Sequence, residues 1–346
     1  MLLDIQLDAR PDKAAERTRA LASTGIAGLF TFEGPHDVFL PLVSAAETVA
    51  ADQMALDLMT NVAIAMPRSP MHLANAAYDL QLLSKGRFRL GLGSQIKPHI
   101  EKRYGATWSP PAARMREIVL AVKAILTSWQ DGTPLDFRGE HTQHTLMPPT
   151  FVPGPNPYGL PPVLLGALGP VMTRTAAEVA DGLLVMPFHS HRHFLERTLP
   201  AVDEGLSRSG RTRADFQIFP QAICAMGRTP AEQEAAALGV RGLLAFYGST
   251  PAYLPVLEVE GWADVQPELN ALSKTGDFAA MMELVDDRML ETLAVRGTPE
   301  ECAAEITRRF GDTADRVCAY FPGYEPPLDQ IAALAASLSG PGLAPS

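Results

Sequence analysis

The regular alternation of strand-like and helix-like segments is the feature that most constrains how this chain can fold. Short apolar segments are separated by amphipathic stretches in which apolar residues recur at positions i, i+3 and i+4. Alternation of this kind predicts an α/β fold of parallel strands joined by right-handed crossovers, and eight units favour a closed (β/α)₈ TIM barrel over an open doubly wound sheet. The predicted strands are residues 2–7, 26–32, 55–65, 88–93, 162–167, 182–188, 216–226 and 317–321.

Two segments are longer than ordinary connections between a strand and a helix. Residues 131–161 are rich in proline, and residues 230–300 have a mostly helical pattern. A barrel with insertions can exceed the roughly 250 residues that the fold usually takes. We therefore expect residues 1–340 to form one barrel domain, with these two insertions shaping a pocket for a small-molecule substrate.

The composition argues against several classes of protein. The net charge is −10, from 29 basic and 39 acidic residues, and the chain has no basic run that would attract a phosphate backbone. No stretch of about 20 continuous apolar residues predicts a membrane span, and the first residues do not resemble a signal peptide. The three cysteines are widely spaced and odd in number, which is typical of a reducing compartment. We expect a cytoplasmic protein that binds neither nucleic acid nor membrane.

In barrels, the loops that follow the strands carry the chemistry. The fourth predicted strand ends in Gly91-Leu92-Gly93-Ser94-Gln95-Ile96, where glycines would let a ligand approach the backbone closely. Ile96 replaces the third glycine of a dinucleotide-binding fingerprint, which argues against a Rossmann site. His99 follows this turn and is a candidate pocket residue. A purely structural tight turn is the alternative interpretation.

The fifth predicted strand ends in Gly166-Ala167-Leu168-Gly169-Pro170, which runs directly into an amphipathic helix. Proline is favoured at the first position of a helix, and the free amides of a helix N-terminus attract anions. The amides of residues 167–169 are therefore candidates to bind a cofactor phosphate. A glycine-tolerant turn without a ligand is the alternative.

The second predicted strand is followed by Glu33, His36 and Asp37, beside a Gly-Pro turn. Histidine titrates near neutrality, and a neighbouring carboxylate can orient its ring, so this group suits general acid and base catalysis at a barrel mouth. The alternative is that Asp37 caps the following helix and His36 is merely exposed.

Three histidines, at positions 189, 191 and 193, follow the sixth predicted strand. Ser190 has the character of a helix N-cap, which would spread the three rings around a first helical turn. No aspartate or glutamate lies within the triplet to complete a metal shell. We therefore predict no metal site here.

Several runs of sequence resemble the signature of luciferase-like monooxygenases and their deazaflavin-dependent relatives. The first runs read RSPMHLA (68–74), LQLLSKGRF (80–88) and LGLGS (90–94). The match continues in order through residues 115–117, 147–149, 162–170, 180–182 and 297–300, so the resemblance covers about 300 residues.

This resemblance implies an oxidoreductase with a bacterial-luciferase-like barrel that holds a flavin or 5-deazaflavin at the carboxyl ends of its strands. The subgroup matched by Glu33, His36-Asp37 and residues 93–99 uses coenzyme F420. Such an enzyme transfers a hydride between the deazaflavin and a small organic substrate. An FMN-dependent monooxygenase that uses O₂ is the first alternative, and a non-catalytic flavin-binding barrel is the second. A homodimer is also expected from the resemblance.

The resemblance assigns cofactor contacts to three loops. It implies a cis peptide bond between Asn61 and Val62, in a bulge that supports the cofactor ring. Relatives that act on sugar phosphates carry a glutamate where this chain has Ile96, so a glucose-phosphate substrate is not expected. The expected cofactor-binding residues are Asn61, Val62, Ala63, Gly93, Ser94, His99, Gly166, Ala167, Leu168 and Gly169.

The expected catalytic residues lie in the loops after the second and fourth predicted strands. We expect His36 to act as the acid and base, with Glu33 or Asp37 setting its tautomer and pKa. Gln95 is expected to hold the substrate or the edge of the cofactor ring. The sequence does not indicate the identity of the substrate or the direction of hydride transfer.

Overall fold

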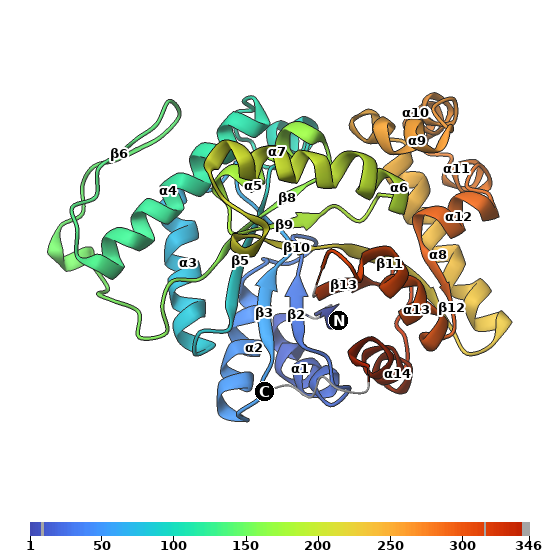
Figure 1. Ribbon diagram of the computed structural model, residues 1–346, viewed down its shortest axis with the longest axis horizontal. Helices are drawn as coiled ribbons and strands as arrows, with labels where there is room; N and C mark the ends of the chain where they lie inside the picture. The colour runs from blue at the N-terminus through green and yellow to red at the C-terminus, as the bar shows by residue number, and fades with distance from the viewer. Residues whose placement is uncertain (8–9, 315, 341–346) are drawn as a thin grey trace.

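The computed structural model describes residues 1–7, 10–314 and 316–340. Each of the eight predicted strand segments contains a strand (Figure 1). The seventh segment contains two strands, separated by Pro220. The strands in these segments are β1 (Leu2–Gln6), β2 (Gly28–Thr31), β3 (Asp57–Thr60), β4 (Ala63–Ile64), β5 (Phe88–Gly93), β8 (Val163–Ala167), β9 (Gly182–Val185), β10 (Gln217–Phe219), β11 (Gln221–Met226) and β13 (Arg316–Tyr320).

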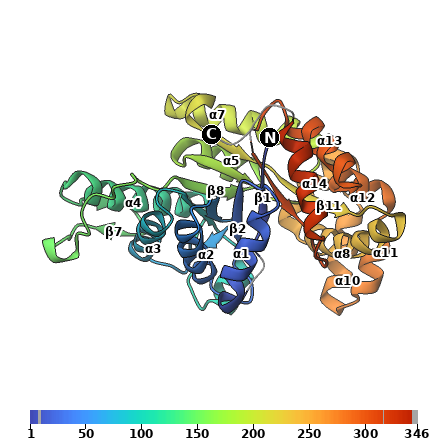
Figure 2. The same cartoon turned by 90° about the horizontal axis from the view of Figure 1, so that it is seen from below.

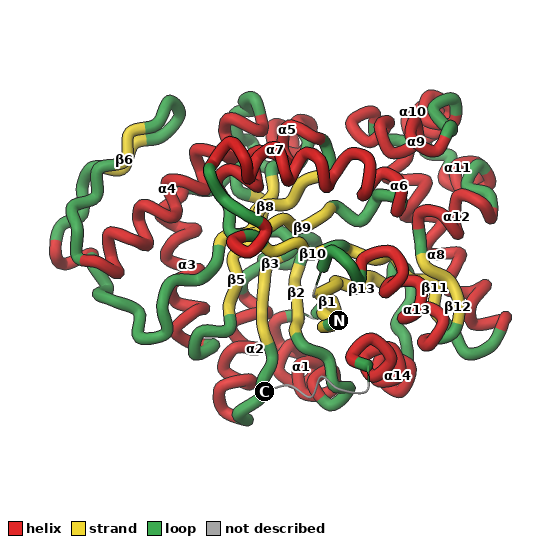
Figure 3. The backbone as a smooth tube through the Cα atoms, in the orientation of Figure 1, coloured by secondary structure: helices red, strands yellow, loops and turns green. Residues whose placement is uncertain are grey.

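These strands form one parallel sheet that curls back on itself (Figure 3). The sheet runs in the order β10-β9-β8-β5-β3-β2-β1-β13-β11, and every pairing in it is parallel. At the two ends of this order lie β10 and β11, which are consecutive in the chain because only Pro220 separates them, and one further strand pairs with the outer edge of β11. The amide of Cys318 on β13 donates to the Pro220 carbonyl at 2.9 Å. The predicted α/β class with parallel strands is confirmed.

Helices pack around the outside of the curled sheet (Figure 2). Helix α4 shows why the periodic sequence folds this way, since Met115, Ile118, Val122 and Ile125 repeat at helical spacing and are buried. It ends at Gly132, whose φ of 65° is left-handed. The main outer helices are α1 (Ala14–Ala22), α2 (Leu40–Ala51), α3 (Pro70–Leu83), α4 (Pro111–Asp131), α5 (Pro170–Val179), α7 (Leu199–Ser209), α13 (Pro299–Phe310) and α14 (Leu328–Ser339).

Shorter helical turns lie in the connections between these elements. They are η1 (Pro11–Lys13), η2 (His99–Arg103), α6 (His191–His193), η4 (Phe194–Thr198) and η5 (Arg213–Asp215). Within the described ranges, no helix is both long enough and apolar enough to cross a membrane.

The proline-rich segment 131–161 carries an antiparallel hairpin that projects away from the sheet (Figure 1). Its strands are β6 (Phe137–Arg138) and β7 (Gln143–His144), and the turn η3 (Pro149–Phe151) follows. Glu117 of α4 holds the hairpin loop, since its carboxylate accepts hydrogen bonds from the amides of Glu140, His141 and Thr142.

The segment 230–300 is mostly helical and packs around a second apolar cluster beside β11. Phe188, Val240, Leu257 and Leu269 are fully buried in this cluster. The short strand β12 (Val295–Gly297), which the sequence does not predict, pairs with β11. The helices of this segment are α8 (Pro230–Gly248), η6 (Pro251–Tyr253), α9 (Leu254–Glu260), α10 (Val265–Thr275), α11 (Phe278–Glu283) and α12 (Asp287–Leu293).

Large side chains fill the inside of the curled sheet. Six strands each contribute one residue to a buried cluster there: Phe30, Met59, Leu164, Leu184, Phe219 and Cys318. Val62 packs on this cluster. The interior is therefore a packed core.

A buried ion network joins the first strand to the last. Arg316 of β13 donates to Asp4 of β1 at 2.9 Å and to Asp57 of β3 at 2.6 Å. Asp4 is fully buried, and burial raises its pKa while Arg316 opposes that shift. Gly28 of β2 lies between these groups, and a Cβ there would collide with the Asp4 carboxylate. The glycine therefore makes room for the network.

Replacing Arg316 should destabilise the fold strongly. Arg316→Met would leave the Asp4 carboxylate buried without its charge partner, which typically costs about 3–5 kcal/mol. Arg138→Met is the matched control, because Arg138 pairs with Asp136 on an exposed hairpin and such pairs contribute less than about 1 kcal/mol. Urea denaturation of both variants measures the difference, and equal loss in the two variants would contradict a structural role for the network.

Candidate active site

A cavity of 840 Å³ lies at the carboxyl ends of the strands. Phe32 follows β2, Asn61 follows β3, Ser94 follows β5 and Met186 follows β9, and all four line it. The helical segment 230–300 closes one side through α8 and η6. The cavity is thus where the barrel architecture predicts a site.

Most of the predicted site residues meet in this cavity. Three of them do not line it: His36, Asp37 and Ala63. Ala63 is fully buried in β4, where it pairs with Leu92. The residues that line the cavity are Glu33, Asn61, Val62, Gly93, Ser94, Gln95, His99, Gly166, Ala167, Leu168 and Gly169.

His36 and Asp37 lie in the loop between β2 and α2, beyond the cavity-lining Gly34. His36 is exposed, and among the described residues neither Glu33 nor Asp37 is hydrogen-bonded to it. Asp37 Oδ1 accepts hydrogen bonds from the amides of Phe39 and Leu40, at 2.8 and 3.2 Å, at the start of α2. Asp37 therefore accepts hydrogen bonds at a helix start, as the alternative interpretation of this residue expected.

Val62 lies between two glycine-containing strands, Gly93 of β5 and Gly166 of β8. A Cβ at Gly93 would collide with Val62 Cγ2, and a Cβ at Gly166 would lie 3.1 Å from Val62 Cγ1. The peptide bond between Asn61 and Val62 is cis, so that expectation is confirmed. The two glycines therefore make room for the Val62 side chain, which the sequence did not reveal.

Asn61 has a partner that the sequence analysis missed. Gln221, the first residue of β11, donates from Nε2 to Asn61 Oδ1 at 3.1 Å across the cavity. Gln221 directly follows Pro220, which interrupts a predicted strand. The proline was the sequence signal that could have pointed to Gln221. The aromatic residues of α8 and η6 were also missed, because helical spacing alone does not distinguish a cavity wall from a core.

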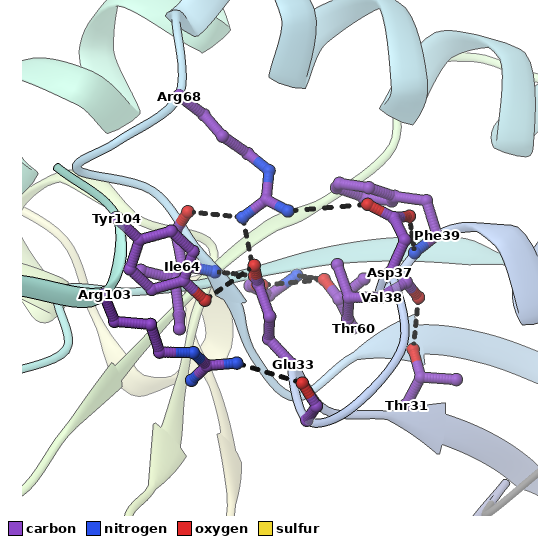
Figure 4. Close-up of polar contacts among 12 residues, drawn as sticks. Thr31, Glu33, Asp37, Val38, Phe39, Thr60, Ile64, Arg68, Arg103 and Tyr104 are labelled. Atoms are coloured by element: carbon purple, nitrogen blue, oxygen red, sulfur yellow. Dashed lines mark hydrogen bonds and ion pairs between the residues drawn. The ribbon is translucent and has the colours of Figure 1, made fainter. Parts of the chain in front are cut away.

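Glu33 joins three loops at the cavity wall (Figure 4). Its Oε2 accepts from the Ile64 amide at 2.8 Å and from Arg68 Nη1 at 2.6 Å, and its Oε1 accepts from the Tyr104 hydroxyl at 2.9 Å. Arg103 adds a contact by donating to the Gly34 carbonyl at 3.0 Å. The loops after β2, β4 and β5 are therefore tied together through one carboxylate.

The Glu33 side chain is only 7% exposed, so its partners are part of the folded structure. Arg68 compensates its charge, and burial together with the Glu33 contact raises the pKa of Tyr104. The carboxylate is thus hydrogen-bonded to Ile64, Arg68 and Tyr104, and these contacts hold the loops together.

His99 and Gln95 come from the loop after β5. His99 begins the π-helical turn η2, and its Nδ1 is buried without a hydrogen-bond partner among the described residues. Gln95 has a left-handed φ of 58°, and its Oε1 accepts from the Ile96 amide at 2.9 Å. The Gln95 amide nitrogen remains available to a ligand.

The loop after β8 ends at the N-terminus of α5. Gly169 is the N-cap residue, no side chain caps the helix, and Pro170 follows as its first residue. The first helical hydrogen bond runs from the Thr173 amide to the Gly169 carbonyl at 3.0 Å, so the amides of Val171 and Met172 precede it. A Cβ at Gly169 would have no atom within 4 Å, which leaves open space beside these amides.

The histidine triplet after β9 is largely buried. Ser190 is the predicted N-cap, since its Oγ accepts from the His193 amide at 3.0 Å. Burial lowers the pKa of His189 to about 3 and that of His193 to about 4, so both rings are neutral near pH 7. Among the described residues, no group of three or more His, Cys, Asp or Glu is arranged to hold a metal ion.

The family model of luciferase-like monooxygenases matches residues 3–316. The chain belongs to the luciferase-like monooxygenase family. Among its curated relatives in this family, an uncharacterized protein of Mycobacterium tuberculosis is 47% identical over 309 residues, which are 89% of this chain and 90% of the relative. The 5,10-methylenetetrahydromethanopterin reductase of Archaeoglobus fulgidus is 30% identical over 245 residues, which are 69% of this chain and 68% of the relative.

Solved structures share the luciferase-like fold. The coenzyme F420-dependent tetrahydromethanopterin reductase of Methanopyrus kandleri has a TM-score of 0.75 at 19% identity, with 96% of this chain and 95% of that chain covered. The oxygenating constituent of a 3,6-diketocamphane monooxygenase of Pseudomonas putida, in complex with FMN, has a TM-score of 0.68 at 15% identity, covering 100% and 99% of the two chains. The chain is therefore an oxidoreductase of this family, whose members include deazaflavin and flavin enzymes.

Removing the Glu33 carboxylate should loosen all three loops. We expect Glu33→Ala to lower the free energy of unfolding by about 1–3 kcal/mol, because buried donors lose their acceptor. Tyr104→Phe deletes only one of the hydrogen bonds and should cost about 1 kcal/mol. Chemical denaturation of both variants and of the double variant checks this. Strictly additive effects would show that Glu33 and Tyr104 do not act together.

Proposed function

We propose that this chain is a coenzyme F420-dependent oxidoreductase, which transfers a hydride between the deazaflavin and a small organic substrate. The observation that carries the proposal is the cavity, where Val62 forms a floor between Gly93 and Gly166 and the N-terminus of α5 opens nearby. The relative from Archaeoglobus and the structural neighbour from Methanopyrus, both methanopterin reductases by name, favour the deazaflavin.

The residues present fit such a cofactor. The amides at the start of α5, beside Gly169, suit a phosphate, and the buried Nδ1 of His99 lacks a partner that a ligand would supply. Val62 would support the ring, with Asn61, Ser94 and the loop 166–168 around it. When bound, a deazaflavin supplies hydride exchange at ring carbon 5 and does not activate oxygen.

The protein groups then have to orient the substrate and move a proton. We assign His36 as the acid and base, since it is exposed in the loop after β2 and can exchange protons with solvent. Asp37, next to it in the chain, or Glu33 is the carboxylate proposed to orient its ring. The amide nitrogen of Gln95 is proposed to hold the substrate or the ring edge.

The second candidate function is an FMN-dependent monooxygenase that uses O₂. The neighbour from Pseudomonas that contains FMN supports it. FMN and coenzyme F420 both carry a phosphate, so the N-terminus of α5 suits either of them. A non-catalytic flavin-binding barrel is the third candidate, which a measured turnover would exclude.

We also propose a complete (β/α)₈ barrel in which β10 and β11 count as one strand, as the parallel pairings at both ends of the sheet suggest. Residues 1–340 would form this single domain, with insertions at 131–161 and 230–300. The family resemblance favours a homodimer, and the three buried free cysteines accord with a cytoplasmic location.

Cofactor titration tests the proposal. We expect coenzyme F420 to bind more tightly than FMN. The change in cofactor absorbance on binding measures both dissociation constants. Gly169→Asp should weaken binding of either cofactor at least tenfold, because its carboxylate would face the bound phosphate. Gly169→Ala is the matched control, since the space beside Gly169 is open and its φ of −71° suits alanine. Tighter binding of FMN would favour the FMN-dependent monooxygenase over the F420-dependent oxidoreductase.

His36→Ala should leave cofactor affinity within a few-fold of the wild type and lower the rate of hydride transfer about 100-fold or more. The physical reason is that His36 is not among the residues that line the cavity, so its loss removes the proposed proton carrier and no cofactor contact. Single-turnover rates decide the matter. An unchanged rate would move the role to His99, whose ring lines the cavity.

A further inference from the structure

The cavity has two chemically different sides. The loops after β3, β5 and β8 line it with small residues and backbone, including Gly93, Ser94 and the segment 166–169. A second group of lining residues carries aromatic rings, which come from the residue after β2, from β13 and from the helical segment 230–300. These rings belong to Phe32, Phe246, Tyr247, Tyr253 and Tyr320.

The aromatic side is held in place by ring contacts. Phe188 is fully buried, and its ring lies 5.9 Å from that of Tyr247 and 6.1 Å from that of Tyr253. The rings of Tyr247 and Tyr253 meet edge to face at 5.9 Å, and those of Phe32 and Tyr320 do so at 6.4 Å. Such pairs restrict ring motion, so this side is a preformed apolar wall.

The phenols of Tyr247 and Tyr253 are the polar groups that the helical segment brings to this wall, and their rings contact each other. Burial raises the pKa of both phenols, which keeps them protonated and able to donate near pH 7. A phenol hydroxyl at a cavity wall can donate a hydrogen bond to a ligand oxygen, which stabilises the bound ligand.

The charged residues of the cavity lie in other loops. Glu33 is committed to Arg68 and Tyr104, Lys97 pairs with Glu101 at 3.8 Å, and Arg103 donates to Gly34. No charged side chain among the described lining residues comes from the helical segment or from β13. An ionic group placed against the aromatic wall would therefore be desolvated without a partner.

We propose that this aromatic wall is the substrate subsite, and that it selects an uncharged apolar molecule with a carbonyl or hydroxyl oxygen, which Tyr247 and Tyr253 bind. The proposal rests on the proposed function, because it assigns the opposite, glycine-containing side to the cofactor. The division follows from chemistry: backbone amides and small residues suit a phosphate and a planar ring, and stacked aromatic rings suit an apolar substrate.

The test compares probes that share one ring and differ in charge. Cyclohexanone, cyclohexanol, cyclohexanecarboxylate and cyclohexylamine are titrated into the cofactor-saturated protein, and binding is followed by the cofactor absorbance. The same titrations of the protein without cofactor use tryptophan fluorescence, since Trp108 lines the cavity. We expect the neutral probes to bind at least tenfold more tightly than the two charged ones. Equal or tighter binding of a charged probe overturns the proposal.

Variants locate the subsite. The double variant Tyr247→Phe, Tyr253→Phe should weaken cyclohexanone binding about threefold to tenfold, as expected for lost hydrogen bonds of about 1 kcal/mol, with cofactor affinity unchanged. Tyr158→Phe is the matched control, because Tyr158 is 44% exposed and lies outside the cavity. Unchanged cyclohexanone binding in the double variant overturns the assignment.

The two proposals fail in distinguishable ways. Failure of the wild type to bind either cofactor would overturn the proposed function, and the fluorescence titrations would still test the subsite. Normal cofactor binding combined with a preference for charged probes would overturn the subsite alone. Thermal melting of each variant verifies that it is folded.

Discussion

The ion network of Arg316 with Asp4 and Asp57 is the constraint on which the curled sheet depends. It fixes β13 against β1 and reaches β3 past Gly28 of β2, so charges from three strands meet beside the glycine of a fourth. Breaking a buried charge pair is costly, which favours the arrangement that keeps all the charges matched. With the strands curled around the buried cluster near Phe30 and Leu164, the cavity opens at their carboxyl ends.

At that end, the loops are fixed to one another before any ligand arrives. Glu33 accepts hydrogen bonds from the segments that carry Ile64, Arg68 and Tyr104, and Gln221 reaches across to Asn61. The Val62 side chain then fills the room that two glycines leave. A site held by such contacts loses little conformational entropy on binding, so the cavity is preorganised for a rigid planar ligand.

The cavity is lined partly by the strand ends of the fold and partly by the inserted helical segment 230–300. The strand ends and the N-terminus of α5 belong to the frame that the family shares in its fold, and they meet the proposed cofactor. The aromatic wall comes mainly from α8 and η6, which lie in a segment outside the strand and helix repeat. Its rings pack on an apolar cluster separate from the one inside the sheet.

The sequence by itself determined the parallel α/β sheet, the family and the N-cap Ser190, because hydrophobic periodicity, turn residues and capping residues act within short windows. It also placed Gly93 at the end of a strand. It grouped Glu33 with its chain neighbour His36, whereas in the structure the partners of Glu33 lie 31, 35 and 71 residues away. Only the curvature of the sheet brings those loops together, since contacts between distant loops depend on strand order and register, which no local pattern encodes.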